Sequence, residues 1–366
     1  VGSEMCIRDR HIEEVYRRYA FPADIAITEG VMGLFDGYDG MQGSSAEVAS
    51  ALDIPVVLIV NAKSTAYSVA PLLYGFKHFY PKVRVIGAVF NFVASENHYY
   101  YLKQACADAG VEALGYLPKQ EDIIIPSRHL GLSLDSDFCF EAFADRIADL
   151  VDKHVCVDRL LELASAPVSA HTEEAGLSHR PSGTMRISVA RDAAFNFVYA
   201  ENIAYLEQLG NVTYFSPLTD KTLPPTDFLY LPGGYPELHL KTLSENQSMR
   251  DAVRAYLEKG GHALAECGGM MYLCRSIIGQ DGNTYPMAGV LDQTATMQQM
   301  KLRLGYRTLQ WGEYRLAGHE FHYSSIVPAE NTLPSCATAF SALGRQVDTP
   351  LYHYRNLLAG YTHLYW

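Results

Sequence analysis

A short apolar segment, a cysteine and two glycines follow one another in residues 263–269, which read ALAECGG. The sequence predicts a buried strand that runs up to Cys267 and a helix that begins directly after it. A sharp strand-to-helix turn exposes the sulfur, the glycines remove steric walls, and a helix N-terminus favours the thiolate. The turn therefore predicts an α/β fold. In it, Cys267 is either a nucleophile or a buried structural thiol, because free cysteine is among the most buried residue types.

The first half of the chain alternates short apolar runs with helix-like segments. The runs are rich in Val and Ile and show little polar alternation, which is typical of strands buried on both faces of a parallel sheet. This pattern predicts a doubly wound α/β domain. The expected strands are residues 23–28, 54–60 and 83–90, and the expected helices are residues 45–52, 65–79 and 99–109.

A second α/β pattern follows a change in composition. Residues 164–184 are rich in Ser, Ala, Pro and Gly and lack apolar periodicity, as interdomain linkers do. We expect domains at residues 11–163 and 186–366, joined by a linker at residues 164–185. The residues before 11 resemble translated sequencing-adapter read-through and are excluded from the fold prediction. In the second domain the expected strands are residues 186–190, 212–215, 228–231 and 262–266, with helices at residues 198–209 and 247–258.

Charge and cysteine content exclude several classes of protein. The chain has 29 basic and 41 acidic residues, a net charge of −12 and no cluster of Lys and Arg, which argues against a nucleic-acid partner. Its 7 cysteines include no CxxC pair, so we expect neither a disulfide framework nor a zinc site, and we expect a cytoplasmic protein. The longest apolar run, residues 54–60, is too short to span a membrane, so we expect no membrane association.

A second glycine-rich turn, residues 231–237 (LPGGYPE), follows another predicted strand. Two glycines at a strand end let backbone N–H groups face an oxyanion, although an ordinary tight turn has the same composition. A cysteine nucleophile also needs a base, and the partners of a catalytic triad meet in space rather than in sequence. The sequence therefore leaves four candidates for this base, which are His319, His322, His353 and His363.

Four segments of the second half resemble the class I glutamine amidotransferase domain of the cobyrinic acid a,c-diamide synthases, which has a flavodoxin-like fold. The resemblance implies that Cys267 is the nucleophile and that His363 activates it. It further implies that Gly234 and Gly268 supply the amides of the oxyanion hole. The four segments are PGGYPE (232–237), AECGGMMYL (265–273), GHEFHYS (318–324) and AGYTHLYW (359–366).

Three further positions of this domain bear on the triad. His319 and His322 lie within one of the matching segments, and we assign them to the architecture of the site, with ordinary core histidines as the alternative. Many members of the family carry Glu two residues after the catalytic His. Tyr365 stands at that position here, so the third member of the triad stays open.

Residues 28–37 (TEGVMGLFDG) follow the first predicted strand and contain two carboxylates. Carboxylates at the carboxyl end of a parallel strand suit Mg²⁺, although acidic residues in a Gly-rich loop are more often simply solvated. The segment resembles the ATP-binding domain of the same family, which is similar to dethiobiotin synthetase. The resemblance implies that Glu29 binds Mg²⁺ and that Asp36 acts near the reacting phosphate and carboxylate.

Two other segments of the first half match the same family. GAVFNFV (87–93) resembles the strand end that reads adenine, which implies that Asn91 lies near the base of ATP. IPSRHLGL (125–132) resembles a family loop, so Arg128 and His129 are candidates to face the anionic substrate. A plain surface loop explains the second segment equally well.

The phosphate-binding loop of such ATP enzymes is not found in this chain. That loop reads GxxxxGK[ST], and no Gly-Lys dipeptide occurs in the sequence. In the family it lies on the first strand, ahead of residues 28–37. We therefore expect a P-loop-type parallel sheet that lacks its first strand and P-loop, in a chain cut at both ends.

The resemblance implies a carbon–nitrogen ligase of cobalamin biosynthesis. We expect ATP- and Mg²⁺-dependent amidation of the a and c acetate carboxylates of cobyrinic acid, with L-glutamine as the ammonia donor. One alternative is diamidation of another tetrapyrrole, such as a nickel sirohydrochlorin. Another is a remnant with at most glutaminase or binding activity. The sequence carries no indication of the oligomeric state.

Overall fold

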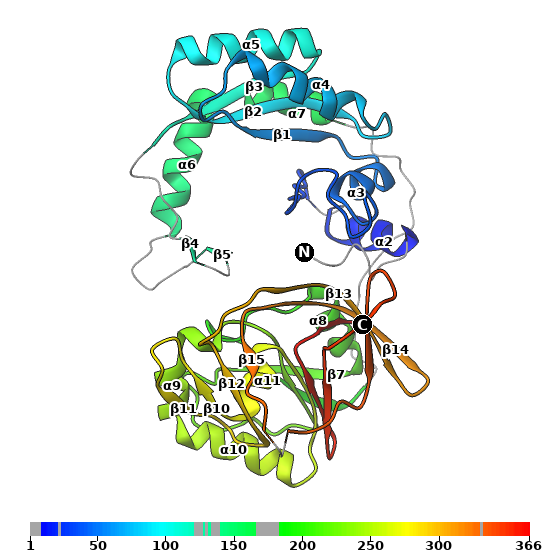
Figure 1. The fold of residues 1–366 in the computed structure, drawn as a ribbon, viewed down its shortest axis with the longest axis vertical. Coiled ribbons are helices and arrows are strands. Elements are labelled where there is room, and N and C mark those ends of the chain that lie inside the picture. The colour runs from blue at the N-terminus through cyan, green and yellow to red at the C-terminus, as the bar shows by residue number, and fades with distance from the viewer. Residues whose placement is uncertain are drawn as a thin grey trace. The chain divides into compact units, whose positions relative to one another are not determined.

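The structure is a computed structural model that describes residues 9–20, 23–120, 127–128, 131–132, 140–165, 183–329 and 332–366. The chain divides into two compact units, residues 9–174 and residues 175–366 (Figure 1). Each unit has its own sheets and its own apolar core.

The N-terminal unit is built on a three-stranded parallel sheet with helices packed on it. Its elements are α2 (Asp9–Ala20), α3 (Ser45–Ala51), β1 (Val56–Asn61), η1 (Tyr67–Val69), α4 (Ala70–His78), β2 (Val85–Val93), α5 (Glu96–Ala109), β3 (Glu112–Pro118), β4 (Ser127–Arg128), β5 (Gly131–Leu132), α6 (Phe140–His154) and α7 (Val157–Ala164). The strand order is β1-β2-β3, and β2 is largely buried because it has a strand on each side and contacts α5 and α7. Ser95 caps α5 by accepting a hydrogen bond from the His98 amide (3.2 Å). The same helix ends at Gly110, whose φ of 68° favours glycine.

The expected strand at residues 23–28 is not a strand in the structure. Among the described residues these positions pair with no other strand, and Ile27 is 91% exposed. An apolar run becomes a strand only when a neighbour supplies partners for its N–H and C=O groups, and periodicity cannot show whether that neighbour exists. The prediction was wrong for this segment, whereas the strands expected at residues 54–60 and 83–90 are confirmed as β1 and β2.

The C-terminal unit is built on a six-stranded sheet. Its elements up to the cysteine turn are β6 (Met185–Ala190), α8 (Ala200–Leu209), β7 (Gly210–Phe215), β8 (Phe228–Leu231), η2 (Pro236–Leu238), α9 (Leu240–Glu245), α10 (Gln247–Glu258), β9 (His262–Glu266) and α11 (Gly268–Leu273). Strand β19 (Leu357–Gly360) and the antiparallel edge strand β18 (Leu351–Tyr354) complete the order β18-β19-β9-β8-β6-β7. Numbered along the chain, the parallel strands are arranged 2-1-3-4-5, which is flavodoxin-like. The expected doubly wound fold of the second half is thus confirmed.

Between α11 and β18 the chain forms two further sheets that the sequence did not predict. Their strands are β10 (Cys274–Ile278), β11 (Thr284–Pro286), β12 (Leu291–Thr296), β13 (Arg303–Trp311), β14 (Tyr314–His322), β15 (Ser325–Ile326), β16 (Thr338–Ser341) and β17 (Gln346–Val347). The last strand of the chain, β20 (His363–Tyr365), pairs with β14 in the antiparallel sheet β17-β16-β13-β14-β20. This pairing brings the end of the chain onto β14.

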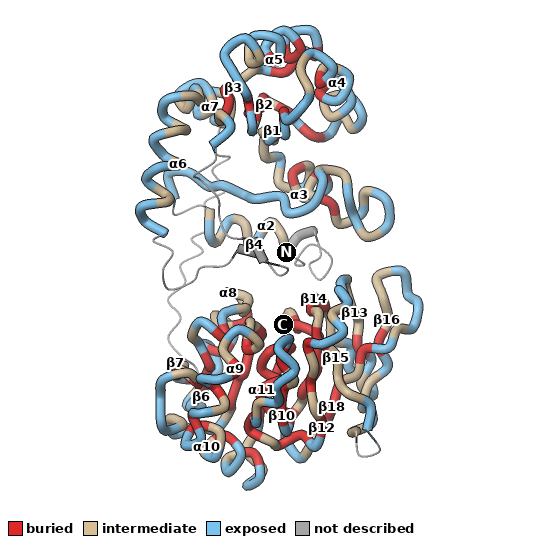
Figure 2. The backbone as a smooth tube through the Cα atoms, turned by 60° about the vertical axis from the view of Figure 1, so that its left-hand side comes forward, coloured by how far each residue is buried: buried red, intermediate tan, exposed pale blue. Residues whose placement is uncertain are grey.

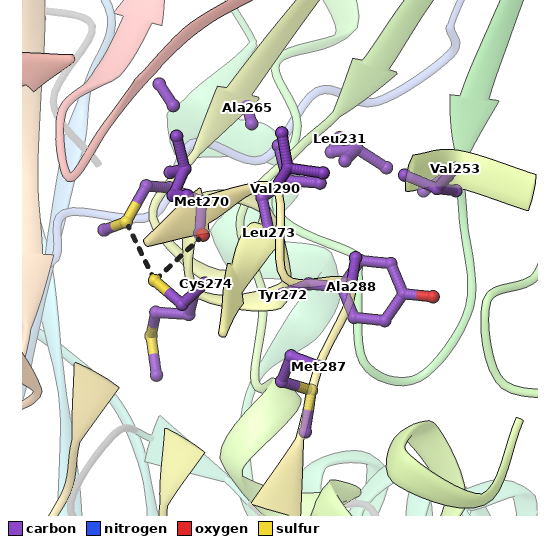
Figure 3. Packing of buried hydrophobic residues seen from close by; sticks show 14 of the residues in the cluster. Leu231, Val253, Ala265, Met270, Tyr272, Leu273, Cys274, Met287, Ala288 and Val290 are labelled. Atoms are coloured by element: carbon purple, nitrogen blue, oxygen red, sulfur yellow. Dashed lines mark hydrogen bonds between the residues drawn. The ribbon is translucent and has the colours of Figure 1, made fainter. Parts of the chain in front are cut away.

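The core of the C-terminal unit includes the whole of α11. Every residue of this helix is buried, and Met270, Tyr272 and Leu273 pack among residues of β8, β9 and α10 (Figure 3). Cys274, the residue after the helix, is also buried and donates its Sγ–H to the Met270 carbonyl at 3.5 Å. Figure 2 shows buried residues along these central strands and exposed ones over the outer loops. The cysteine turn that starts α11 is therefore set in a packed core.

Candidate active site

The predicted site segments follow the carboxyl ends of three neighbouring strands of the C-terminal sheet. Strand β8 ends at Leu231, β9 at Glu266 and β19 at Gly360, and the three strands are adjacent in the order β19-β9-β8. The chain continues from these ends into residues 232–234, Cys267 and residues 361–363. Carboxyl ends of parallel strands share one edge of a sheet, where α/β proteins bind their ligands. The fold thus brings together three segments that are far apart in the sequence.

Cys267 occupies the sharp turn that the sequence predicted between a strand and a helix. Its φ of 46° and ψ of −105° are strained for a residue with a side chain, and such strain persists only where the surroundings enforce it. Its amide donates to the Gly360 carbonyl (2.7 Å), and its carbonyl accepts from the Met271 amide (2.9 Å). Strand β19 and helix α11 therefore hold this residue from both sides, in the geometry of a nucleophile elbow.

Burial determines the charge state of the cysteine. Cys267 is 5% exposed, and burial is the largest effect that raises the pKa of its thiol, followed by the nearby Glu237 carboxylate. The Gly268 amide lowers the pKa of this thiol, as expected at a helix N-terminus, but its effect is smaller. Burial outweighs the effect of the turn, so the surroundings of Cys267 favour the neutral thiol over the thiolate. Burial also raises the pKa of Glu237 to about 7.

Of the four candidate histidines, His363 lies against the glycine turn that follows β8. A Cβ on Gly233 would overlap the Cε1 atom of the His363 ring, so only glycine fits at this position. The ring is 3% exposed, and burial lowers the pKa of His363 well below its usual value, with smaller contributions from His319 and His322. The resting ring is therefore neutral and able to accept a proton. His353 is exposed on strand β18.

The two glycines expected to form the oxyanion hole lie in contact. A Cβ built on Gly268 would lie 3.2 Å from the amide nitrogen of Gly234 and 3.2 Å from its carbonyl oxygen. Gly234 has a φ of 153°, and a Cβ there would overlap the Ala194 carbonyl. The absence of side chains at both positions lets the two turns and the residues around them pack closely together.

Glu266 connects the cysteine turn to the histidine strand, a role that the sequence analysis missed. This buried carboxylate accepts hydrogen bonds from the Tyr230 hydroxyl (2.8 Å) and from the Leu364 amide (3.1 Å). Burial raises the pKa of Glu266 to about 8. Glu266 precedes Cys267, and Leu364 follows His363. The hydrogen bond between them therefore links the segment that carries Cys267 to the segment that carries His363. The sequence did contain a signal for this role, because Glu266 is an acidic residue at the end of a largely apolar strand, directly before the turn.

A second buried carboxylate, Glu320, organises the strand beside His363. It accepts hydrogen bonds from Arg307 Nε (2.6 Å), the Thr349 hydroxyl (2.8 Å) and His322 Nε2 (2.9 Å). Burial alone would raise the pKa of Glu320, but His322, Arg307 and Thr349 together lower it. The carboxylate is therefore charged and fully paired, as a buried charge must be.

His322 has both ring nitrogens engaged. Its Nδ1 lies 2.8 Å from the Ser324 carbonyl and its Nε2 lies 2.9 Å from Glu320. Both partners are hydrogen-bond acceptors, so they fix the rotation of the ring. The ring also stacks on Tyr361, with centroids 3.7 Å apart and planes 6° apart. His322 thus supports the segment that leads to His363, in agreement with the architectural role expected for it.

The site residues predicted in the N-terminal unit are more exposed. Glu29 and Asp36 lie in an exposed loop, where the Asp36 carboxylate folds against Gly33. Asn91 lies near the end of β2, opposite Asn61 of β1, and its Oδ1 accepts a hydrogen bond from the Phe92 amide (2.8 Å). Among the described residues, no three His, Cys, Asp or Glu side chains lie close enough together to hold a metal ion.

The anionic-substrate residues cannot be placed in the same way. Only the backbone of Arg128, in strand β4, is described, and His129 lies outside the described residues. Most of the expected linker, residues 166–182, lies outside them as well. In the part of the chain that the structure covers, no helix combines the length and apolar character that crossing a membrane requires.

Comparison with known proteins shows the family to which the chain belongs. The profile of the "CobB/CobQ-like glutamine amidotransferase domain" matches residues 186–366. A protein of Priestia megaterium named cobyrinate a,c-diamide synthase is 36% identical, over 97% of this chain and 79% of its own length. A second protein of that name, from Listeria innocua, is 34% identical, over 98% of this chain and 82% of its own length. The chain belongs to the cobyrinate a,c-diamide synthase family.

Membership in this family confirms the resemblance deduced from the sequence motifs. These proteins are glutamine-dependent amide-forming ligases, so the expected enzyme class is confirmed too. A related protein of Pseudomonas aeruginosa, named hydrogenobyrinate a,c-diamide synthase, is 36% identical over 95% of this chain and 78% of its own length. A solved structure titled "Crystal structure of glutamine amidotransferase" covers 48% of this chain and 89% of its own, at 18% identity and a TM-score of 0.34.

Proposed function

We propose that the C-terminal unit hydrolyses glutamine with Cys267 as nucleophile and His363 as general base. The observation that carries this proposal is the meeting of three segments at adjacent strand ends. They are the strained, buried cysteine, the buried neutral histidine and a glycine turn too tight for side chains. A thiol and a neutral imidazole beside an oxyanion-binding turn are the parts that acyl transfer from an amide requires.

The proposed reaction proceeds in two halves. In the first, His363 takes the thiol proton while the Cys267 sulfur attacks the side-chain amide carbon of glutamine. The negative oxygen of the tetrahedral intermediate is stabilised by the amides of Gly234 and Gly268, and His363 returns the proton to the departing ammonia. In the second half, His363 activates a water molecule, which cleaves the thioester and releases glutamate. Because burial favours the neutral forms of both groups, the proton moves during the attack rather than before it.

We propose that the ammonia amidates the a and c acetate carboxylates of cobyrinic acid. The support is the family, whose members bear this activity in their names. Hydrogenobyrinate is the second candidate, because the relative named for it is equally similar, at 36% identity. Converting each corrinoid with the purified enzyme and measuring the diamide by mass spectrometry distinguishes the two.

The N-terminal unit is proposed to bind ATP and Mg²⁺. A Cβ on Gly30, the residue after Glu29, would lie 2.8 Å from the Ser45 hydroxyl, so the backbone next to Glu29 packs against the start of α3. The Glu29 carboxylate is a ligand of the kind that Mg²⁺ takes. ATP, when bound, would supply the phosphoryl group that activates a carboxylate. In the proposed assignment, Asp36 lies near the reacting groups and Asn91 near the adenine.

Three further assignments belong to this proposal. Arg128 and His129 are assigned to the anionic corrinoid. Domain boundaries at 11–163, 164–185 and 186–366 are supported by the change in composition and by the start of the family match at residue 186. A cytoplasmic location is supported by the absence of disulfides among the described cysteines.

Two cysteine variants test the glutaminase proposal. Cys267→Ala is expected to lower the release of glutamate from glutamine at least about 10³-fold, because it removes the nucleophile. Cys274→Ala is the matched control, since this thiol is also buried but hydrogen-bonds the Met270 carbonyl. It is expected to retain activity. Equal activity of the parent and the Cys267→Ala variant would refute the assignment.

A further inference from the structure

The catalytic histidine of the proposed glutaminase lacks a carboxylate partner. Among the described residues, the Nδ1 atom of His363 is buried and has no hydrogen-bond partner. The family position for a triad glutamate holds Tyr365, which pairs with Ala317 in the sheet and has its ring centroid 5.2 Å from that of Tyr199. Something other than a carboxylate must fix the orientation of the His363 ring.

One face of the His363 ring is covered by His319. The two residues lie directly opposite each other across the β14–β20 ladder, which places both side chains on the same face of the sheet. Their ring centroids are 4.9 Å apart and their planes differ by 17°, so the rings are stacked. His319 is 5% exposed. The register of the sheet itself therefore creates this contact.

Phe197 packs against both imidazoles. Its ring centroid lies 4.5 Å from that of His363 and 5.4 Å from that of His319, in each case at an interplanar angle of 61°. The Phe197 amide donates to the Gly233 carbonyl (3.1 Å), and Gly233 itself closes the Cε1 side of the His363 ring. Three neighbours thus confine the imidazole: a stacked ring, a perpendicular ring and a glycine backbone.

His319 is in turn held by Tyr199. The Tyr199 hydroxyl lies 2.6 Å from His319 Nδ1, which fixes the rotation of that ring. Burial lowers the pKa of His319 to about 4, so His319 is neutral at neutral pH. The other titratable groups that bear on His363 or its strand are His322, which is paired with Glu320, and Glu266, which is joined to the Leu364 amide.

We propose that His319 is a positioning residue for His363. Stacking by His319 and edge-on packing by Phe197 replace the orienting carboxylate of a catalytic triad. His319 contributes the flat face of a neutral ring and takes no part in proton transfer. This inference rests on the proposed function, since it assigns a role within the same glutaminase site. It predicts that any neutral aromatic ring at position 319 suffices, whereas a side chain without a ring does not.

The test compares ring-containing and ringless variants in the full chain. His319→Ala is expected to lower kcat for glutamine hydrolysis about 10²-fold with little change in KM, because a misplaced base slows chemistry more than binding. His319→Phe is expected to stay within about fivefold of the parent and to keep the acidic limb of the pH–rate profile unchanged. His319→Asn is a second ringless variant, should the alanine variant fail to fold. Thermal unfolding establishes that each variant is folded.

Two results would overturn the proposal. The first is parental kcat in a folded ringless variant. The second is a His319→Phe variant as slow as the ringless ones, or one with a displaced acidic limb, since a ring nitrogen would then be required.

A second readout separates this inference from the proposed function. Alkylation of Cys267 by iodoacetamide, located by mass spectrometry, reports how well His363 accepts the thiol proton. If the parent releases no glutamate, the proposed function fails, yet the alkylation rates still rank the variants. Slower alkylation in His319→Ala than in His319→Phe supports the positioning role, and equal rates in the two contradict it.

Discussion

The two units differ in how they hold their predicted site residues. In the C-terminal unit, Cys267 and His363 are 5% and 3% exposed, and ladder pairing or backbone hydrogen bonds fix the segments that carry them. In the N-terminal unit, Glu29 and Asp36 lie on an exposed loop after a segment that joins no ladder among the described residues. The position of a site residue is therefore fixed more firmly when the strand before it is paired with its neighbours.

The contrast has a simple physical origin. The C-terminal site lies where β6, β8, β9 and β19 run side by side, so each loop is anchored by a strand with neighbours on both sides. Among the described strands of the N-terminal sheet, β2 lies between β1 and β3, which each have one neighbour. A strand that is paired on both sides fixes the start of the loop that follows it. The glycine-rich segments of the C-terminal unit therefore form buried turns, whereas the glycine-rich residues 28–37 of the N-terminal unit form an exposed loop.

The largest expected effect tests whether buried charge holds the C-terminal site together. Glu320→Gln leaves Arg307 and His322 without their charged partner, and we expect the free energy of unfolding to fall by about 3–5 kcal/mol at pH 7. Glu313→Gln, on the exposed turn of the same hairpin, is the matched control and is expected to change little. Chemical denaturation measures both. A loss below about 1 kcal/mol for Glu320→Gln would show that the network does not stabilise the unit.

The same variant carries a pH signature. The pKa of Glu320 is lowered in the folded state, so its contribution to stability is present above the unfolded pKa of about 4.5 and is lost as the pH falls through the folded pKa. The parent should therefore lose stability at acidic pH more steeply than the Glu320→Gln variant. Parallel curves below pH 4.5 would contradict this assignment.

A smaller effect, confined to activity, tests the tight packing of the glycine turn. Gly233→Ala inserts a Cβ into the His363 ring, and we expect about a 10²-fold loss of glutaminase kcat as the ring is displaced. Gly312→Ala is the control, because that turn has a φ of 57° but open space around it. It should cost stability but not activity. Full activity in Gly233→Ala would mean that the ring position is not critical.

The smallest expected effect concerns a substitution in the exposed loop of the N-terminal unit. Asp36→Asn changes an exposed side chain of the N-terminal loop, so we expect stability within about 0.5 kcal/mol of the parent and unchanged glutaminase activity. ATP-dependent amidation is the activity that this substitution should impair. A change of more than about twofold in glutaminase activity would mean that Asp36 contributes to the C-terminal site, contrary to its assignment.

Much of the C-terminal fold follows from the sequence alone. The strands predicted at residues 228–231 and 262–266 and the helix predicted at residues 247–258 coincide with β8, β9 and α10. Apolar runs bounded by glycine turns have few alternatives to buried parallel strands, so local pattern and tertiary structure agree there. The strands between residues 274 and 357 were not predicted, because their partners lie far apart along the chain.

The sequence by itself determined the α/β class, the strand-to-helix turn at Cys267 and the family, since each depends on residues close together in the chain. The family resemblance named His363 among the four histidines. Only the tertiary structure placed its ring against Gly233, joined Glu266 to the strand that carries it, and stacked His319 on its ring. The structure also shows that Cys267 is buried, which raises the pKa of its thiol. These outcomes depend on strand order, ladder register and exclusion of water, which arise only when distant segments pack together.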